Sequence, residues 1–424
     1  MITLILFFLL LLFGVPIAIV LGLTTVIYVL TTGNFGMFDS LPQRLFNGIQ
    51  NFSLLAIPMF VLVGELMNTG GITTRLIRFS SVVFGSVRGG LAYVNVAANM
   101  FLASIMGSAT AQTAVMSRTI VPEMEKQGYS RDFASALTAA SSIVGPLIPP
   151  SMPFIIYGVL AGVSISKLFV AGIVPGILFG VCFALMIYVI SIKQNFPRSE
   201  RPTWSKVWKD TLNVLPALAI PTIIMVGILL GIFTATESAA IAALLAFLVG
   251  AFFYRELKFK DLPKILSNTV ITSATVAFLI TVSNLFGWVL TYEKIPQLIA
   301  KSILAFADSQ WAFLLLVNLI LFLVGMFLDG VAALILLVPI LYPIAMNYGV
   351  DPIHFGVLIT INLTIGLMTP PVGTVLFVTS ALAEIKIERL VKALLPFLIM
   401  AFVVMFLITY VPQLTTAIFQ WIKI

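Results

Sequence analysis

The sequence predicts an all-α polytopic membrane protein, and three observations support this fold class. Of the 424 residues, 60% are hydrophobic and only 9% are charged, which is too little charge for a surface that faces water. Apolar runs at residues 2–29, 212–230, 239–253 and 394–407 are long enough, alone or with their flanks, to cross a hydrocarbon core of about 30 Å as helices. The runs lack the alternation of polar and apolar residues that is typical of a membrane β-barrel.

The residue inventory narrows the possible functions. Cys182 and His354 are the sole cysteine and histidine, so neither an intrachain disulfide nor a structural zinc site is expected. The sequence contains no P-loop motif for ATP, so uphill transport would need an ion gradient or another subunit. No His, Cys and Asp pattern with catalytic spacing occurs, and we therefore do not expect an enzyme.

The first element expected along the chain is a retained transmembrane helix. Residues 1–43 contain no Lys or Arg, and the apolar run is too long for a signal peptide. The most polar stretch, KQNFPRSERPTWSKVWKD, begins at residue 193. Because short basic loops stay in the cytoplasm, we predict a cytoplasmic connector over 193–211. It would separate a first repeat, 1–192, from a second repeat, 212–424.

Two similar stretches, SIVGPLIPPSM and TIGLMTPPVGT, reveal an internal duplication. A shift of 221 residues carries Pro149 and Pro150 onto Pro370 and Pro371. The same shift aligns further backbone-shaping residues without a gap: Gly145 with Gly366, Pro122 with Pro343, Gly128 with Gly349, and Pro175 with Pro396.

Each repeat is expected to contain a re-entrant hairpin followed by a broken helix. Small residues, GSATA at 107–111 and DG at 329–330, interrupt apolar segments whose arms are too short to cross twice. We therefore predict hairpins at about 104–125 and about 328–346, and broken helices at about 132–163 and about 353–383. Outside the hairpins we count five crossings in the first half. The second half has six if 212–232 and 236–253 are separate helices, although repeats of inverted topology need odd numbers.

The proline doublets indicate what the breaks do. Proline removes an N–H group and clashes with the preceding turn, and the carbonyl oxygens that are freed need a partner in a low-dielectric medium. Two broken helices at mid-membrane are typical of the binding site of a secondary transporter. Hydroxyls at Ser104, Ser108 and Thr110, with Asp329 and Thr369 in the second half, form a hard oxygen set that suits an alkali cation better than zinc or copper.

Simpler interpretations stay open for most of these residues. The prolines could be kinks, Asp329 a helix cap, and the hydroxyls packing groups. Glu65 is either an intramembrane functional residue or an interfacial one. Arg118 either meets an anionic substrate or pairs with Glu or lipid headgroups, and we favour the pairing. Glu237 is read as a helix-capping charge and His354 as structural.

The motifs resemble the large membrane subunit, or M subunit, of tripartite ATP-independent periplasmic (TRAP) transporters. The resemblance covers essentially the whole chain. It rests on LFGVPIAIVLG, IPMFVLVGELMNTGGI, GSATAQTAV, GPLIPPSMPFIIYG, GIFTATESAA and the second-half DG…GLMTPPVG.

The resemblance implies the transporting subunit of a Na⁺-coupled importer of organic acid anions, of the sialic acid or C4-dicarboxylate type. Such subunits lie in the bacterial cytoplasmic (inner) membrane. They work with a periplasmic substrate-binding protein (P-type) and a small four-helix membrane subunit (Q-type), which we expect as a separate chain because the M pattern begins at Met1. The implied mechanism is an elevator, with a scaffold and a transport domain that holds both hairpins.

The resemblance also implies sites for two or more Na⁺ ions, with Gly, Ile and Pro acting through backbone carbonyls. The implied ligands are Ser104, Ser108, Gly145, Ile148 and Pro150 in the first repeat, and Asp329, Gly366, Thr369 and Pro371 in the second.

For the organic anion we expect hydroxyls and hairpin N–H groups around Thr110, Ser151 and Thr374. The main alternative function is an autonomous ion-coupled anion carrier or exporter that needs no binding protein. A channel or a structural membrane protein is a third class, which leaves the duplicated breaks unexplained.

Overall fold

The computed structural model describes residues 6–7, 9–11, 13–198, 203–304 and 307–420. Every named element in these ranges is helical, as the composition predicts. The helices of the first half are α2 (Ile17–Thr32), α3 (Gly36–Ile49), η1 (Phe52–Leu55), α4 (Ala56–Thr69), α5 (Ile72–Phe84), α6 (Gly90–Met106), α7 (Ala109–Lys126), α8 (Arg131–Ser142), α9 (Met152–Ala161) and α10 (Ile165–Lys193).

The second half of the chain contains the remaining helices. They are α11 (Trp204–Leu229), α12 (Ala235–Leu248), η2 (Val249–Phe253), η3 (Phe259–Asp261), α13 (Leu262–Tyr292), α14 (Ile295–Leu304), α15 (Gln310–Phe327), α16 (Gly330–Asn347), α17 (Pro352–Leu367), α18 (Thr374–Leu382), α19 (Ile387–Tyr410), α20 (Gln413–Thr416) and η4 (Ala417–Gln420).

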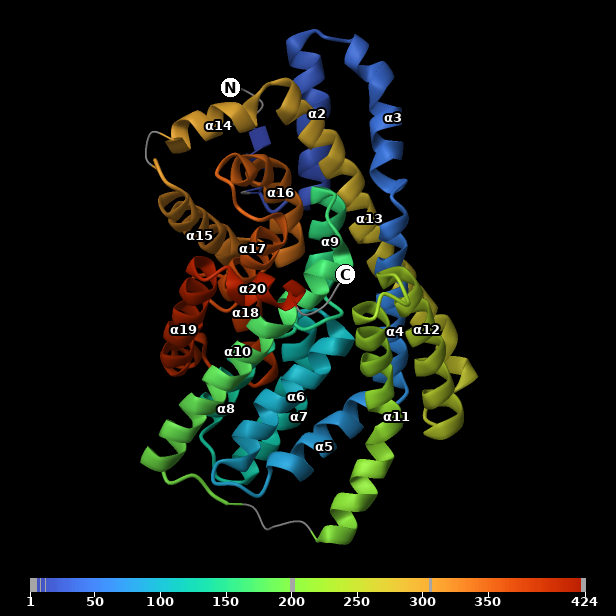
Figure 1. The fold of residues 1–424 in the computed structure, drawn as a ribbon, viewed down its shortest axis with the longest axis vertical. Helices are drawn as coiled ribbons and strands as arrows, with labels where there is room; N and C mark the ends of the chain where they lie inside the picture. The colour runs from blue at the N-terminus through green and yellow to red at the C-terminus, as the bar shows by residue number, and fades with distance from the viewer. Residues whose placement is uncertain (1–5, 8, 12, 199–202, 305–306, 421–424) are drawn as a thin grey trace.

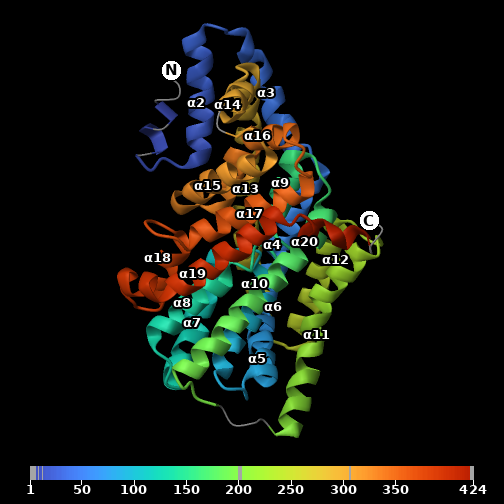
Figure 2. The same ribbon diagram turned by 60° about the vertical axis from the view of Figure 1, so that its left-hand side comes forward.

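The helices form two groups that run side by side. Helices α3, α4, α11, α12 and α13 lie along one side of the molecule in Figure 1, and α4 packs against both α12 and α13. Helices α6, α7 and α8 lie with α10 and α15–α19 on the other side. In the turned view, α11 and α12 lie at the right and α8, α18 and α19 at the left (Figure 2). We call the first set the α13 group and the second set the α17 group.

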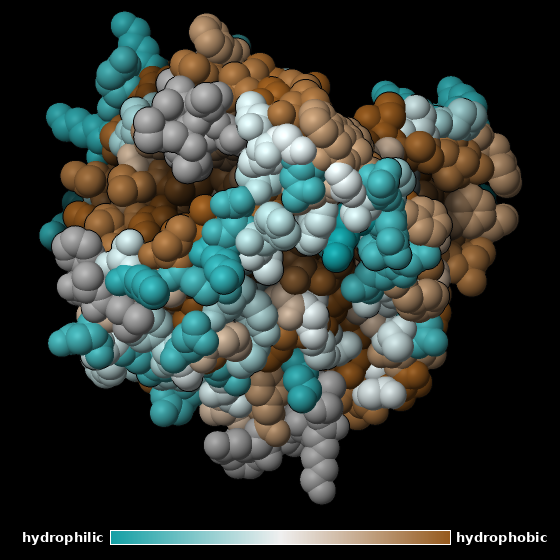
Figure 3. All heavy atoms as spheres, turned by 90° about the horizontal axis from the view of Figure 1, so that it is seen from above, coloured by the Kyte–Doolittle hydropathy of each residue, from teal (hydrophilic) through white to brown (hydrophobic). Residues whose placement is uncertain are grey.

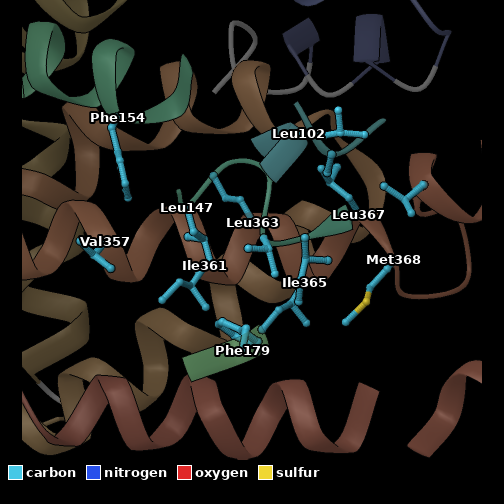
Figure 4. Packing of buried hydrophobic residues seen from close by; sticks show 14 of the residues in the cluster. Leu102, Leu147, Phe154, Phe179, Val357, Ile361, Leu363, Ile365, Leu367 and Met368 are labelled. Atoms are coloured by element: carbon cyan, nitrogen blue, oxygen red, sulfur yellow. The ribbon is translucent and has the colours of Figure 1, made fainter. Parts of the chain in front are cut away.

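The core of the α17 group is built from both halves of the sequence. Figure 4 shows Leu147 and Phe179 of the first half packed beside Ile361 and Ile365 of α17. Every residue of α17 from Ile353 to Leu367 is buried. Because α17 is surrounded on all sides, it shows no amphipathic face, as expected of a helix that is apolar all round.

The outer surface is unusually apolar. Large side chains such as Leu244, Phe252 and Phe278 are more than half exposed. Seen from one end, polar side chains spread across the molecule, with apolar ones between and around them (Figure 3). Within the described residues, eight helices are long and apolar enough to span a bilayer, and we conclude that the chain is a multi-pass membrane protein.

Several expected boundaries differ from the structure. The apolar run at 2–29 is not one helix, because non-helical residues 13–16 precede α2. Gly14 there has a positive φ of 71°, and Pro16 lacks the N–H that helix continuation needs. The expected connector at 193–211 is shorter, because α11 already begins at Trp204; residues 199–202 lie outside the described ranges.

The helix pairs at the small-residue turns are longer than expected. Their arms are α6 with α7 and α15 with α16, so the pairs extend over 90–126 and 310–347 instead of 104–125 and 328–346. The sequence ranges included only the turn and one arm, because nothing in an uninterrupted apolar run marks where the first arm begins. Helices α11 and α12 are separate, as one of the two expected readings of 212–253 has them.

Candidate functional site

No helix continues through either proline doublet. Residues 143–151, called the first break, separate α8 from α9. Residues 368–373, called the second break, separate α17 from α18. The Pro149–Pro150 and Pro370–Pro371 peptide bonds are both cis. Within the first gap, Ser151 caps α9 by accepting a hydrogen bond from the Phe154 N–H at 3.3 Å, and its own hydroxyl donates to the Pro146 carbonyl.

The turn between α6 and α7 packs directly onto the first break. Gly107 ends α6 with a left-handed φ of 54°, and Ser108 is the N-cap of α7. A Cβ atom on Gly107 would lie 3.1 Å from the Pro150 carbonyl oxygen and 3.2 Å from the Met152 nitrogen. Glycine therefore satisfies both the turn and the close approach of two backbones. Residues 107 and 108 are called the first tip.

The turn between α15 and α16 occupies the corresponding place in the second half. Asp329 is the N-cap of α16, and its Oδ2 accepts a hydrogen bond of 3.1 Å from the Val331 N–H. The Gly373 N–H donates to the Met326 carbonyl at 2.9 Å, which ties the second break to the end of α15. Residues 329 and 330 are called the second tip.

The two tips meet at a cavity of about 380 Å³, called the tip cavity. It lies between α13 of one helix group and α16 and α17 of the other. Its polar lining consists of Ser108 and Thr110, Thr272 and Thr275 of α13, Asp329, and Thr360 and Thr364 of α17. The described residues that line it include no Lys, Arg or His, so the cavity offers hydroxyls, a carboxylate and two helix N-termini.

Three of the sequence-predicted site residues line this cavity: Ser108, Thr110 and Asp329. The backbone candidates Gly145 and Ile148 lie in the first break outside it, as do Gly366 at the end of α17 and Pro371 in the second break. Pro150 lines a neighbouring cavity. Ser104 lies in the last turns of α6, but its side chain is outside the described part of the structure.

The remaining candidates use their hydroxyls differently. Thr369 donates to the Ile365 carbonyl at 2.8 Å, which is the back-bonding pattern of a threonine at a helix end. Ser151 is fully buried and bonded within the first break. Thr374 begins α18, and its buried hydroxyl has no hydrogen-bond partner in the described structure.

Gln112 was not among the predicted residues. Its Nε2 donates to Asn99 Oδ1 at 2.7 Å, and Asn99 in turn donates to Asn95 Oδ1 at 2.8 Å. Its Oε1 atom is buried without a partner among the described residues, beside the first break, where a Cβ on Gly145 would lie 2.5 Å away. A buried amide oxygen without a donor is costly, so a water molecule or a cation beside this atom would stabilise it. The sequence did contain one indication of Gln112, because this residue belongs to the motif GSATAQTAV.

Four threonines that line the tip cavity were also missed. Thr272 and Thr275 lie one helical turn apart on α13, and Thr360 and Thr364 do so on α17. The spacing places each pair on one helix face. The sequence offered no reason to prefer these faces, because both helices contain other hydroxyl residues.

The donor set around the breaks fits a sodium ion. The described oxygens include Gln112 Oε1, the Ser108 hydroxyl and the Asp329 carboxylate, and alkali cations prefer hard oxygen ligands. Within the described residues, no group of three or more His, Cys, Asp or Glu side chains is suited to a transition metal.

Three other charged or titratable residues singled out in the sequence lie away from the tip cavity. Glu237 forms a capping box with Thr234 at the start of α12, as its sequence predicts. His354 is buried, with Nδ1 2.8 Å from Thr415 Oγ1, an arrangement that joins α17 to the C-terminal segment. Arg118 is exposed on α7, away from the residues that line the tip cavity.

The fold has a clear counterpart among solved structures. The crystal structure of the Alcanivorax borkumensis YdaH transporter is similar with a TM-score of 0.66, at 15% identity, over 90% of this chain and 89% of that chain. Fold and cavity together define the class of protein, which is an all-helical multi-pass membrane protein with a polar cavity between two groups of helices.

The family follows from the sequence comparison. Residues 4–414 match the model of the tripartite ATP-independent periplasmic transporter, DctM component, and the chain belongs to this family. It is a transporter permease and not an enzyme.

Named relatives cover nearly the whole chain. The sialic acid TRAP transporter large permease protein SiaM of Vibrio cholerae is 38% identical over 95% of this chain and 94% of its own length. The C4-dicarboxylate TRAP transporter large permease protein DctM of Pseudomonas aeruginosa is 38% identical over 90% of each. The isethionate TRAP transporter permease protein DctMQ of Oleidesulfovibrio alaskensis is 38% identical over 96% of this chain but only 64% of its own length.

Proposed function

We propose that this chain is the transporting subunit of a Na⁺-coupled importer of organic acid anions of the sialic acid or C4-dicarboxylate type. The observation that carries the proposal is the tip cavity, where Ser108 and Asp329 from the two halves of the sequence line one space. The names of the relatives, which include a sialic acid and a C4-dicarboxylate permease, support the substrate class.

The charges of the tip cavity explain why anion transport would need sodium. An organic anion would enter a space whose sole charged side chain among the described lining residues is the Asp329 carboxylate, and two like charges at short range repel. Bound Na⁺ would reverse this repulsion, while the N-termini of α7 and α16 add partial positive charge. The anion and the cations would therefore bind together, and this joint binding is the basis of symport.

We assign the sodium ligands in two sets. The first set consists of the oxygens of Ser104, Ser108, Gly145, Ile148 and Pro150, to which the unpartnered Gln112 Oε1 is added. The second set consists of Asp329, Gly366, Thr369 and Pro371. Thr110, with Ser151 and the unpartnered Thr374 hydroxyl, is proposed for the substrate, and the two threonine pairs of α13 and α17 extend that set.

The moving parts would follow the division into two helix groups. We propose that the α13 group is the scaffold and the α17 group is the transport domain of an elevator in the bacterial inner membrane. The two halves of the sequence would be inverted repeats, with α6–α7 and α15–α16 as re-entrant hairpins. The first tip packs against the first break, and the end of α15 is hydrogen-bonded to the second break, which supports each pair moving as one body.

Two partners complete the proposed system, a periplasmic substrate-binding protein and a small four-helix membrane subunit of the Q type. The DctMQ relative, whose name joins the two components and whose length exceeds the matched region, supports a Q-type partner. In this chain the matched family region occupies residues 4–414.

Reconstitution into proteoliposomes tests the proposal. The chain, its Q-type partner and the loaded binding protein are expected to give uptake only with an inward Na⁺ gradient, and K⁺ should not replace Na⁺. Uptake that ignores Na⁺ would contradict the coupling. Uptake of free substrate without the binding protein would instead support an autonomous carrier.

A further inference from the structure

A second cavity of about 330 Å³ lies on the other side of the first tip; we call it the α4 cavity. Phe60, Val61, Gly64, Glu65 and Asn68 of α4 form one wall, and Ala111 and Val115 of α7 belong to the opposite wall. Gly107, Ser108, Met152 and Thr272 line both cavities. The first tip therefore separates the α4 cavity from the tip cavity.

Glu65 is the sole charged side chain among the described residues that line the α4 cavity. It is half-buried, and its Oε2 accepts a hydrogen bond of 3.2 Å from Asn268 Nδ2 of α13. The neutral amide holds the carboxylate in place without neutralising it. The rest of the wall is apolar or weakly polar.

We propose that Glu65 draws Na⁺ into the α4 cavity and so forms the access route to the first sodium site, separate from the route of the organic anion. This inference rests on the proposed function. Two of the proposed ligands, Ser108 and Pro150, line the α4 cavity itself. A cation that enters it would reach these oxygens without crossing the tip cavity.

The negative charge of Glu65 favours Na⁺ over an organic anion in the α4 cavity. A cleft with low-dielectric walls focuses the field of the charge that lines it, and it raises the local concentration of ions of opposite sign. The same carboxylate disfavours an organic anion in the α4 cavity. Glu65 thus attracts the ion through its field, which favours both entry and occupancy, and the oxygens of the first break coordinate it.

The test compares Glu65→Gln with wild type in the reconstituted system with its binding protein. The half-saturating Na⁺ concentration should rise at least about fivefold at low ionic strength, with the half-saturating substrate concentration unchanged at saturating Na⁺. Added choline chloride should shrink the difference by screening. In detergent without substrate, stabilisation by Na⁺ in a thermal melt should need correspondingly more Na⁺.

Control variants distinguish an effect of charge in the α4 cavity from an effect of charge elsewhere on the protein. Glu65→Asp keeps the charge and should stay near wild type. Glu388→Gln removes the same charge from an exposed position in the first turn of α19 and should have no effect. Asn68→Asp adds a carboxylate to the α4 cavity and should lower the half-saturating Na⁺ concentration, which keeps the test decisive if Glu65→Gln fails to fold.

Equal Na⁺ dependence of Glu65→Gln, Glu388→Gln and wild type would overturn the inference while the proposed function stands. A changed half-saturating substrate concentration with unchanged Na⁺ dependence would also overturn it, because the cavity would then belong to the anion. Na⁺-independent uptake by wild type would instead refute the proposed function.

Discussion

At the scale of single residues, the breaks depend on glycines at which two backbones touch. A Cβ atom on Gly366 would lie 2.5 Å from the Gly325 carbonyl carbon and 2.6 Å from the Gly325 Cα. Both obstacles are backbone atoms, which cannot move aside as a flexible side chain can. Gly366 therefore brings the end of α17 into direct contact with α15, where the second tip begins.

Gly366→Ala is expected to destabilise the protein by about 1–3 kcal/mol, because overpacking forces the two helices apart. Gly330→Ala is the matched control, since its Cβ would meet only Leu367 Cδ1 at an ordinary 3.6 Å. Thermal melting in detergent measures both. Equal melting temperatures for the two variants would show that α15 and α17 separate without cost.

At the scale of elements, the helix caps decide where the breaks end. Ser130 and Ser151 cap α8 and α9 in the same way, each accepting a hydrogen bond of 3.3 Å from the third N–H of its helix. The Ser151 hydroxyl also donates to the Pro146 carbonyl inside the first break. Ser151 therefore stabilises the break as well as the helix.

The two serines form a matched pair of variants. Ser130→Ala should cost about 1 kcal/mol as a lost N-cap. Ser151→Ala should cost more, because it also leaves the buried Pro146 carbonyl without its donor. Thermal melts, followed by the Na⁺ dependence of uptake, measure the difference. A Ser151→Ala variant that melts like Ser130→Ala would show that the bond to Pro146 contributes nothing.

At the scale of the whole molecule, the two halves interlock around α17. The Tyr157 hydroxyl of α9 donates to the Pro352 carbonyl of α17 at 2.7 Å, and a Cβ on Gly356 would lie 2.4 Å from the Tyr157 ring. Near the helix ends, Arg389 pairs with Asp132 at 2.9 Å. The two halves are therefore not separate bodies, and the proposed elevator would have its boundary between the two helix groups.

Cross-linking across that boundary tests the elevator. A Cβ built on Gly287 of α13 lies 3.5 Å from the Pro339 Cβ of α16, a separation suited to a disulfide. In a background without Cys182, Gly287→Cys with Pro339→Cys should lose uptake on oxidation and regain it on reduction. Oxidation is checked by the shift in electrophoretic mobility.

The control cross-link stays inside the α13 group. A Cβ on Gly48 of α3 lies 3.4 Å from the Asn284 Cβ and 3.0 Å from the Thr281 Cα of α13. Uptake by the reduced Gly48→Cys, Asn284→Cys variant is therefore the reference, and closing this bridge should not lower it. Full activity with a closed Gly287–Pro339 bridge would refute movement of α16 along α13.

Local features of the sequence were sufficient for the all-helical multi-pass class, the family and the position of both breaks. The reason is that hydrophobic length, proline and glycine act on the backbone near them, and a shift of 221 residues repeats them. The same features led to Ser108, Thr110 and Asp329, because each lies at a small-residue turn.

Packing between distant helices was needed to establish which oxygens face a common space. Thr272 and Thr360 were missed because a hydroxyl looks the same in sequence whether it faces a cavity or a neighbouring helix. Gln112 was missed because its unpaired oxygen depends on Asn99, from another helix, holding its nitrogen. The starts of α6 and α15 did not follow from the sequence, because apolar runs in a membrane do not mark their own ends. Where a side chain points depends on which helices surround it, and that is a property of contacts between segments far apart in the chain.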